Sequence, residues 1–466
     1  MTRPSSLEVA VLTIGLLLPV ACEQTLRTGK VGNTTNAPNP DGTCPAGLTV
    51  CGRGAFAQCL DLQSDRAHCG SCDHACVQGI ACTAGACQQV VCGGQVTVSS
   101  QTLAGSTATT APGQIVGALL VDLNGDGRPD LVTWRNDYDT EWAVGHGTFQ
   151  VALGEAGGGF GPASTYQASI FVLEIVAGDA NADGFQDLYI LNELFQNPCV
   201  EIWLGHADGK LTRAKDTGIS GCLGAIAAGD LNGDGKVDLV TAGTDAEPVV
   251  YLADANGGFH VGTSYPASRG AFTVLRDWNG DGFPDLVALG DTLGVSLNKG
   301  NGTFEDEQDC GVAASYWAVL GDFNRDGLLD VADILGNNVT VLLGMGGCQF
   351  QPMIEYPLTD AVEALASGDL NGDGLTDLVT KMVDGQISLL LGGPDGAFQV
   401  VPLSVGLTPG PEEHGTLLVG DVTGDGKPDI VFVPGVGDTQ VEITGDGGSV
   451  VVSGSGATAI LENTCP

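Results

Sequence analysis

The sequence predicts an all-β fold, a seven-bladed β-propeller preceded by a small disulfide-rich module. Three observations support this prediction: a short acidic motif recurs seven times, an apolar β-prone stretch follows each copy, and Gly supplies 72 of the 466 residues. That Gly content is about twice the usual share and is typical of a chain rich in turns. Because internal repeats override a domain count taken from length, the repeat sets the expected architecture.

The motif has nine residues and begins at Asp122 as Asp-Leu-Asn-Gly-Asp-Gly-Arg-Pro-Asp. Every copy keeps Asp at positions 1, 5 and 9 and Gly at position 6, and position 3 is Asn in every copy except the last, which has Thr423. Side-chain oxygens at alternate positions converge when the backbone wraps around one point, and the Gly permits the sharp turn. Position 7 would add its carbonyl and position 9 both carboxylate oxygens. The pattern predicts a hard cation, and calcium is the expected ion.

These loops resemble the FG-GAP/VCBS repeats of integrin α-subunit propellers and of many exported bacterial proteins, over roughly residues 95–466. The resemblance implies about one calcium ion per blade, held at positions 1, 3, 5, 7 and 9. The hydroxyl of Thr423 is a weaker ligand than an amide carbonyl. The implied ligand sets are Asp122, Asn124, Asp126, Arg128 and Asp130; Asp179, Asn181, Asp183, Phe185 and Asp187; Asp230, Asn232, Asp234, Lys236 and Asp238; Asp277, Asn279, Asp281, Phe283 and Asp285; Asp322, Asn324, Asp326, Leu328 and Asp330; Asp369, Asn371, Asp373, Leu375 and Asp377; and Asp421, Thr423, Asp425, Lys427 and Asp429.

The motif has two alternative interpretations. Seven solvated Asp/Asn/Gly turns are the simpler one, since such turns are common on surfaces. An EF-hand would need a bidentate Glu at position 12 and flanking helices. Position 12 is never Glu, and the residues after each loop are apolar and β-prone, as in Leu188-Tyr189-Ile190. The EF-hand is therefore excluded.

Successive copies begin 45–57 residues apart, a span that suits a four-stranded propeller blade. In the first repeat we expect strands at 118–121, 130–134 and 149–153, then a Gly-rich hairpin into a fourth strand. In each such hairpin Gly supplies the turn and an apolar residue, such as Phe160, packs back on the blade. A single blade cannot bury both of its faces, whereas seven blades in a ring can.

The first residues resemble an export signal. Residues 1–21 place Arg3 before an apolar run that is too short to span a membrane. The sequence ending at Cys22 resembles a bacterial lipobox, although Pro19 stands where Leu is usual, so lipidation of Cys22 is expected; an ordinary signal peptide is the alternative. Residues 22–43 read as a flexible tether. The mature protein is expected at the cell surface or outer membrane, or free outside the cell.

Residues 44–94 contain nine cysteines and few large apolar residues, so disulfides are expected to replace a core. Zinc binding is the alternative for the segment from His68 to Cys76. The module resembles small Cys-rich modules that precede propellers in exported bacterial proteins, and its pairing cannot be deduced from sequence.

Six further cysteines lie outside this module. Plausible bridges join Cys199 to Cys222 and Cys310 to Cys348. We also expect Cys465 to pair with the module, at Cys92, if the strand-like segments beside these two cysteines are neighbours in the closing blade. A free or intermolecular Cys465 is the alternative.

Composition and motifs argue against several function classes. The formal charge is −39, which makes nucleic acid and anionic membranes poor partners. No Gly-x-Ser-x-Gly, His-Glu-x-x-His or phosphate-loop motif is present. No catalytic or cofactor-binding residue is therefore predicted.

The most distinctive insertion is a long connection between the second and third strands of the first repeat. Trp134, Tyr138, Trp142 and His146 lie on it, on the face that binds ligands in integrins by analogy. Aromatic rings with polar neighbours suit sugar stacking or a protein anchor. The alternative is that the two Trp rings cover blade edges. Trp278, in a loop position that is otherwise apolar, is expected in the core.

The sequence therefore predicts an exported, calcium-binding propeller that acts in recognition or adhesion, with a protein or glycan ligand. The alternatives are a polysaccharide-acting enzyme and a passive cell-surface scaffold, since fold alone does not settle function.

Overall fold

The computed structural model describes most of the repeat region and four short strands before it. The described ranges are 49–51, 58–60, 82–83, 86–87, 97–102, 114–139, 144–192, 199–214, 217, 219, 224–243, 246–254, 258–264, 270–315, 317–407, 415–433, 440–445, 448–453 and 457–462. Within these ranges the chain forms strands, turns and bends, and no helix there is long and apolar enough to cross a membrane.

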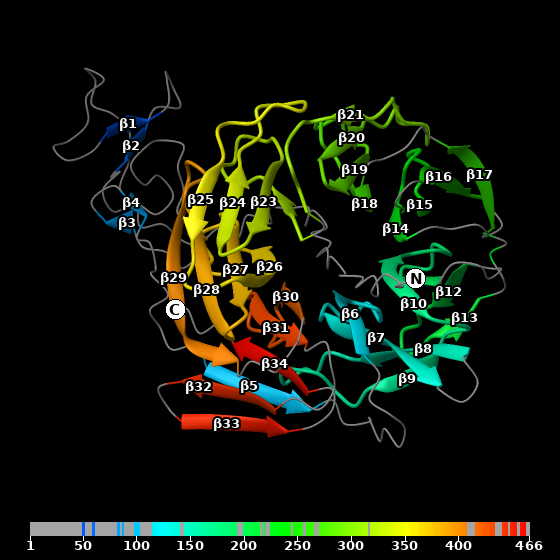
Figure 1. Ribbon diagram of the computed structural model, residues 1–466, viewed down its shortest axis with the longest axis horizontal. Coiled ribbons are helices and arrows are strands. Elements are labelled where there is room, and N and C mark those ends of the chain that lie inside the picture. The colour runs from blue at the N-terminus through cyan, green and yellow to red at the C-terminus, as the bar shows by residue number, and fades with distance from the viewer. Residues whose placement is uncertain are drawn as a thin grey trace, which may run out of the picture. The chain divides into compact units, whose positions relative to one another are not determined.

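The repeats form seven antiparallel sheets, which we call blades one to seven in the order of their acidic loops (Figure 1). In each blade the first strand leads into the loop and the second leaves it. The strands are β6 (Gln114–Val121), β7 (Asp130–Asp139), β8 (Val144–Ala152) and β9 (Ser164–Gln167); β10 (Val172–Gly178), β11 (Asp187–Asn192), β12 (Val200–Leu204) and β13 (Thr212–Arg213); β14 (Ala225–Gly229), β15 (Asp238–Gly243), β16 (Ala246–Ala253) and β17 (Phe259–Ser264); β18 (Gly270–Arg276), β19 (Asp285–Gly290), β20 (Gly294–Ser296) and β21 (Gln308–Asp309); β22 (Val319–Gly321), β23 (Asp330–Leu335), β24 (Asn338–Leu342) and β25 (Ile354–Pro357); β26 (Val362–Gly368), β27 (Asp377–Met382), β28 (Gln386–Gly392) and β29 (Phe398–Leu407); and β30 (Thr416–Gly420), β31 (Asp429–Val433), β34 (Ala457–Glu462) and β5 (Thr97–Thr102).

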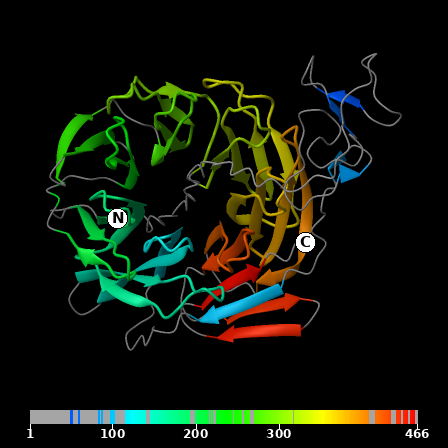
Figure 2. The same cartoon turned by 180° about the vertical axis from the view of Figure 1, so that it is seen from behind.

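The blades follow one another around a ring, with the first strand of each blade innermost (Figures 1 and 2). β6 lies against both β10 and β30, which joins blade one to blade two and to blade seven. Blades four and five share one hydrophobic cluster that includes Val287 of β19 and Val331 of β23. The fold is an all-β propeller, as the sequence predicted.

The ring is closed by a strand from each end of the repeat region. β34 pairs with β31 on one side and with β5 on the other, and Leu461 stands opposite Val98. Ile460 of β34 packs with Ala118 of blade one in a single cluster. The predicted neighbourhood of the first and last strand segments is therefore confirmed.

Packing between blades explains why the second strand of each repeat is rich in apolar residues. All six residues of β11 are buried. Leu188 and Ile190 join a cluster with blade one, whereas Tyr189 and Leu191 join a cluster with blade three. Successive side chains of a strand point to opposite faces, so each blade is covered on both sides by its neighbours.

Two features were not expected from the sequence. The connection in blade one is a long hairpin, because β7 and β8 pair as far as Asp139 and Val144. In addition, β32 (Gln440–Gly445) and β33 (Gly448–Ser453) form a hairpin. In the sequence this hairpin lies between β31 and β34 of blade seven, but it pairs with the outer strand of blade six, with Leu407 of β29 opposite Ile443.

The chain divides into two compact units. The larger unit holds the blades except residues 371–375, which group with the smaller unit. The described part of the smaller unit contains two hairpins, β1 (Thr49–Cys51) with β2 (Gln58–Leu60), and β3 (Cys82–Thr83) with β4 (Ala86–Cys87).

Candidate functional site

Each acidic loop ends on a fully buried carboxylate. The closing Asp at position 9 is 0% exposed in all seven loops. In loop one, the Oδ2 of Asp130 accepts the N–H of Leu123 at 2.9 Å and its Oδ1 accepts the N–H of Gly154 at 2.8 Å. The loop, the second strand and the end of the third strand are thus tied to one side chain. The same bonds join Asp187 to Ala180 and Gly205, Asp238 to Leu231 and Ala253, Asp285 to Trp278 and Asn298, Asp330 to Phe323 and Gly344, and Asp377 to Leu370 and Gly392.

The other acidic and amide side chains of the loop are oriented by N–H groups of the same turn. In loop one, Asp122 accepts the N–H groups of Asp126 and Gly127 at 3.1 and 2.8 Å. Asn124 accepts the N–H of Asp126 at 3.0 Å, and Asp126 accepts that of Arg128 at 3.0 Å. Position 1 accepts the same two N–H groups in loops two to five and in loop seven.

The backbone of each loop turns through two left-handed residues, at positions 4 and 6. Position 6 is Gly throughout, with φ between 80° and 90°. Position 4 is Gly in five loops, but Ala182 and Arg325 occupy it with φ of 58° and 61°. A side chain is strained in this conformation. The wrap that the sequence predicted is thus formed even where the residue does not favour it.

Burial changes the protonation of the closing carboxylates. It raises the pKa of Asp130 to about 6, partly offset by the two backbone N–H donors, while the charges of Asp122 and Asp126 raise it further. The pKa of Asp330 is raised to about 6 for the same first reason, and burial also raises those of Asp187, Asp238 and Asp285. A nearby positive charge would favour the ionised form of these groups.

In loops one and three the position 7 side chain supplies a positive charge to the carboxylate at position 5. Arg128 lies 2.5 Å from Asp126, and Lys236 lies 2.6 Å from Asp234. The hydrogen bond from Lys236 lowers the pKa of Asp234.

The loop residues match the ligand types that a hard cation requires. Each loop offers carboxylate and amide or hydroxyl oxygens together with main-chain carbonyls. In loop seven the Oγ1 of Thr423 is buried and, among the described residues, makes no hydrogen bond. The described residues contain no group of three or more His, Cys, Asp or Glu side chains that could hold a metal ion by themselves. The predicted set therefore depends on the amide and main-chain oxygens as well as the carboxylates.

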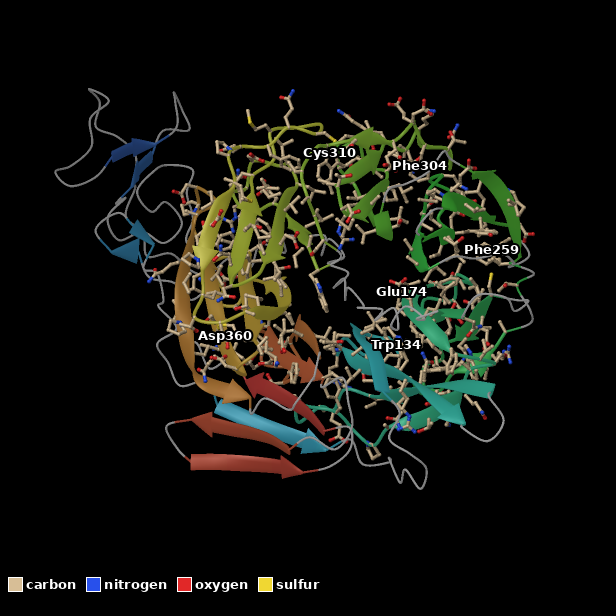
Figure 3. The ribbon with its side chains drawn as sticks, viewed as in Figure 1. Trp134, Glu174, Phe259, Phe304, Cys310 and Asp360 are labelled. Atoms are coloured by element: carbon tan, nitrogen blue, oxygen red, sulfur yellow. A yellow bond between two sulfur atoms is a disulfide. The ribbon has the colours of Figure 1, made fainter. Side chains whose placement is uncertain are left out.

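The residues of blade one that were predicted to bind a protein or glycan fall into two groups. Trp134 is 1% exposed and packs in the cluster between blades one and two, which agrees with the packing alternative (Figure 3). Tyr138 and His146 lie on the paired part of β7 and β8, at the end away from the acidic loop. Their side chains and the whole of Trp142 lie outside what the structure describes. Trp278 is 5% exposed in the core, as predicted.

The structure also shows a buried polar network that no sequence motif predicted. The Glu201 carboxylate accepts the Nδ2 of Asn192 at 3.0 Å, the Nε1 of Trp203 at 3.2 Å and the backbone N–H of Ser169 at 2.8 Å. The guanidinium of Arg213 lies 3.2 Å away. The only sequence signal was one acidic residue inside the apolar run of β12.

Disulfide predictions are confirmed where the structure describes both partners. Cys310 is bonded to Cys348, and this bridge joins blade four to blade five. Cys199 is also disulfide-bonded, while its expected partner Cys222 lies outside the described residues. The expected pairing of Cys92 with Cys465, and the lipidation of Cys22, concern residues outside them too.

Comparisons with known proteins identify the family of the repeats. A family model for FG-GAP-like repeats matches residues 122–190, 179–241, 277–332, 322–380 and 369–432. An Agrocybe aegerita lectin, whose structure concerns recognition of non-reducing terminal N-acetylglucosamine, is 17% identical, with a TM-score of 0.47 over 75% of this chain and 94% of that chain. A chain of the BBS1N–ARL6DN complex is 12% identical, with a TM-score of 0.46 over 79% of this chain and 98% of that chain. No curated protein matches. Since the repeat matches extend over more than half of the sequence, the chain belongs to the family of FG-GAP-like repeat proteins.

Proposed function

We propose that this protein is an exported, calcium-binding propeller of the cell surface that acts in recognition or adhesion by binding a protein or a glycan. The observation that carries the proposal is the repetition of one acceptor-rich turn in seven loops, each closed by an Asp that is 0% exposed. A packed β-scaffold does not require a buried carboxylate at the same place in every blade. A bound cation explains the repetition, because it balances these charges.

The side-chain oxygens of positions 1, 3 and 5, the carbonyl of position 7 and the carboxylate of position 9 would hold one calcium ion in each loop. When bound, calcium supplies positive charge to carboxylates that otherwise repel one another. Asp130 already accepts two backbone N–H groups, but each carboxylate oxygen has a second lone pair. The N–H donors therefore orient the carboxylate oxygens and leave one lone pair on each oxygen to bind the ion.

Recognition is supported by the rigidity of the ring and by the connections it carries. Every described blade is packed on both faces, so connections between strands stand on a fixed support. The long β7–β8 hairpin is one of the connections opposite the acidic loops, and its predicted contacts are Tyr138, Trp142 and His146. The cell-surface location rests on the export signal and Cys22.

A binding screen tests the proposal. Full-length protein should be offered to a glycan array and to surface extracts, once with millimolar calcium and once after chelation. A ligand bound in calcium and lost in chelator supports recognition by a calcium-loaded ring. Elemental analysis that finds no calcium in protein purified without chelator contradicts the metal part of the proposal, and a ligand bound equally in both conditions separates recognition from calcium.

A further inference from the structure

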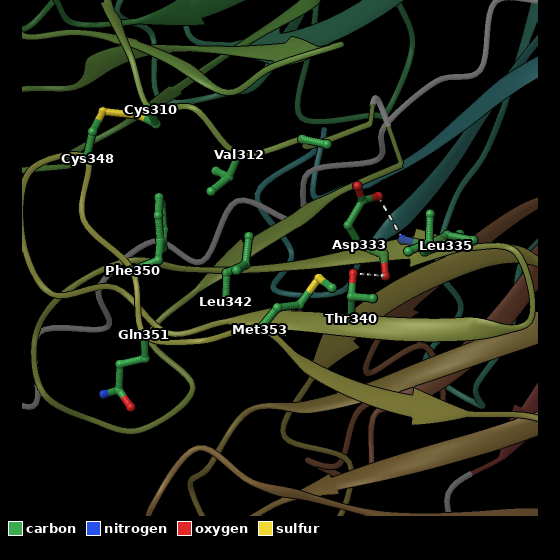
Figure 4. A pocket seen from close by; sticks show the side chains of 12 residues that line it. Cys310, Val312, Asp333, Leu335, Thr340, Leu342, Cys348, Phe350, Gln351 and Met353 are labelled. Carbon is green, nitrogen blue, oxygen red and sulfur yellow. Dashed lines mark hydrogen bonds between the residues drawn. A yellow bond between two sulfur atoms is a disulfide. The ribbon is translucent and has the colours of Figure 1, made fainter.

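A pocket lies between blades four and five, beside the Cys310–Cys348 bridge, and we call it the four–five pocket (Figure 4). Its volume is about 420 Å³. Small-molecule sites usually enclose about 300–1,000 Å³, so this space can admit a ligand. It involves neither the acidic loops nor the β7–β8 hairpin and is therefore separate from the proposed calcium and recognition sites.

The wall of the four–five pocket is mostly apolar. Its large apolar lining residues include Leu335, Leu342, Phe350 and Met353. Leu335 is 57% exposed and Met353 46% exposed, although both are large apolar side chains. Phe350 makes an edge contact with Trp278, their ring centroids 6.2 Å apart, so its position is fixed by the core of the neighbouring blade.

One carboxylate supplies the only charge among the residues that line the pocket. Asp333 is 9% exposed, and no described Lys, Arg or His forms an ion pair with it. Its oxygens accept the N–H and the hydroxyl of Ser315 at 2.7 and 2.5 Å and the N–H of Ile334 at 2.7 Å. These donors fix the position of the carboxylate, and among the described residues Oδ2 accepts one hydrogen bond, from the N–H of Ser315.

The repeat shows that blade packing does not require this charge. Asp333 occupies position 12 counted from the start of loop five, and the residues at that position in the other repeats are uncharged: Thr133, Ile190, Thr241, Ala288, Thr380 and Phe432. Placing a carboxylate here costs desolvation that an apolar side chain would avoid. Holding Ser315 is one use for it, and a cationic ligand is another.

From this combination we propose that the four–five pocket binds an organic ammonium ion, that is, an alkyl- or arylammonium group carried on an apolar body. The ammonium pairs with the fixed carboxylate of Asp333, and the hydroxyl oxygen of Thr340, which lines the same pocket, can accept a further hydrogen bond. The apolar body packs on Leu342 and Met353, and the Phe350 ring favours a cation over its face. Such a ligand is a free amine or the lysine side chain of a partner protein.

Phenethylamine is a suitable probe, with 2-phenylethanol as its uncharged counterpart of nearly equal shape. Titration calorimetry at pH 7 in about 150 mM NaCl screens the long-range attraction of a strongly acidic chain for cations. We expect saturable one-to-one binding of the amine. The alcohol should bind at least about tenfold more weakly, because it lacks the charge that pairs with the carboxylate.

Variants separate the pocket from the rest of the surface. Asp333→Asn removes the charge, and Met353→Trp fills the space while leaving the charge in place; each should abolish binding. Met345→Trp is the matched control, since Met345 is another exposed Met of the same blade, 57% exposed, that does not line the pocket, and this variant should bind as wild type does. Melting curves identify any variant that fails to fold. If one of the two pocket variants does not fold, the other one tests whether the amine binds in the pocket.

Two results would overturn the proposal: amine and alcohol binding alike, or amine binding that survives both pocket variants. A parallel titration with N-acetyl-lysine methylamide distinguishes the two sources. If it binds at the same place, the pocket accepts a partner's lysine; if only phenethylamine binds there, the pocket is for a free amine.

Discussion

The Glu174 carboxylate on β10 accepts the N–H of Ile226 on β14 at 2.8 Å, across the boundary between blades two and three. Glu174 is 8% exposed (Figure 3). Burial raises its pKa to about 7 from 4.5, and the single hydrogen bond offsets only part of that rise.

Glu174→Gln should therefore stabilise the protein at pH 8 and change little at pH 5. A carboxyl group with a raised folded pKa binds more protons in the folded state, so wild-type stability falls as the pH rises from about 4.5 through 7. The difference should reach up to about 3 kcal/mol at 1.36 kcal/mol per unit. Urea unfolding at both pH values measures it. Glu305→Gln, an exposed control, should show no such difference, and a stabilisation equal at both pH values would contradict the titration.

Chelation of calcium should lower the melting temperature at pH 7.5. For a site with a Kd of ~10⁻⁴ M, millimolar calcium adds ~1.4 kcal/mol, and several sites add together if they are independent. Acid should weaken the effect, because protons compete with the ion below pH 6 at Asp130 and Asp330, whose pKa values are about 6. Thermal melts with and without EDTA at pH 7.5 and pH 5 provide the measurement. A melt that EDTA leaves unchanged at pH 7.5 would sink the calcium proposal.

Lys236→Ala should increase the calcium affinity of loop three. The ammonium of Lys236 lies 2.6 Å from Asp234, a proposed ligand, and has to be displaced or to share the carboxylate when calcium binds. The contact is partly exposed, so we expect a change of no more than about fivefold in Kd. Lys210→Ala removes a similar pair, with Asp208, outside any acidic loop and serves as the control. Calorimetric titration should show tighter binding only in the first variant.

Ala182→Gly should stabilise the calcium-free protein. Ala182 adopts a φ of 58°, a conformation that costs an L-residue roughly 1–2 kcal/mol relative to Gly. The greater freedom of Gly in the unfolded chain offsets about 0.4–1 kcal/mol of this, which leaves a net stabilisation of up to about 1.6 kcal/mol. Ala207→Gly, at an exposed turn without positive φ, should instead be neutral or destabilising. Chemical unfolding of the two variants decides between these outcomes.

Replacing Cys310 and Cys348 together by Ser should destabilise the ring. The bridge joins residues separated by 38 positions. The chain-entropy model gives at most about 4 kcal/mol for a loop of this length, and measured values are often smaller. Thermal unfolding of the double variant tests the effect, with wild type in reducing buffer as the comparison. If the double variant and wild type are equally stable in non-reducing buffer, packing alone holds blades four and five together.

The sequence predicted the features that repeat and those that depend on neighbours in the chain. The turn at each acidic loop, the apolar second strand and the burial of Trp278 all follow from local residue types, and the structure confirms them. The segments that form β34 and β5 were expected to come together because closing a ring requires its ends to meet, and the structure shows that they pair.

The remaining features depend on contacts between residues far apart in the chain. Glu174 and Ile226 are 52 positions apart, and nothing around Glu174 in the sequence indicates which N–H it meets. The β32–β33 hairpin belongs to blade seven by sequence but extends the sheet of blade six, because the exposed edge of β29 offers unpaired backbone groups. Asp333 differed from its repeat counterparts in the sequence, but only the structure shows that it faces a pocket.

The seventh blade also sets the order in which the molecule can be completed. Its outer strand, β5, precedes every other strand of the ring, and its partner β34 is the last. During synthesis β5 therefore leaves the ribosome long before β34 has been made, so the emerging chain cannot close the ring early. The last pairing of the ring therefore forms only after β34 has been made. A truncation that removes β34 should leave a ring that never closes.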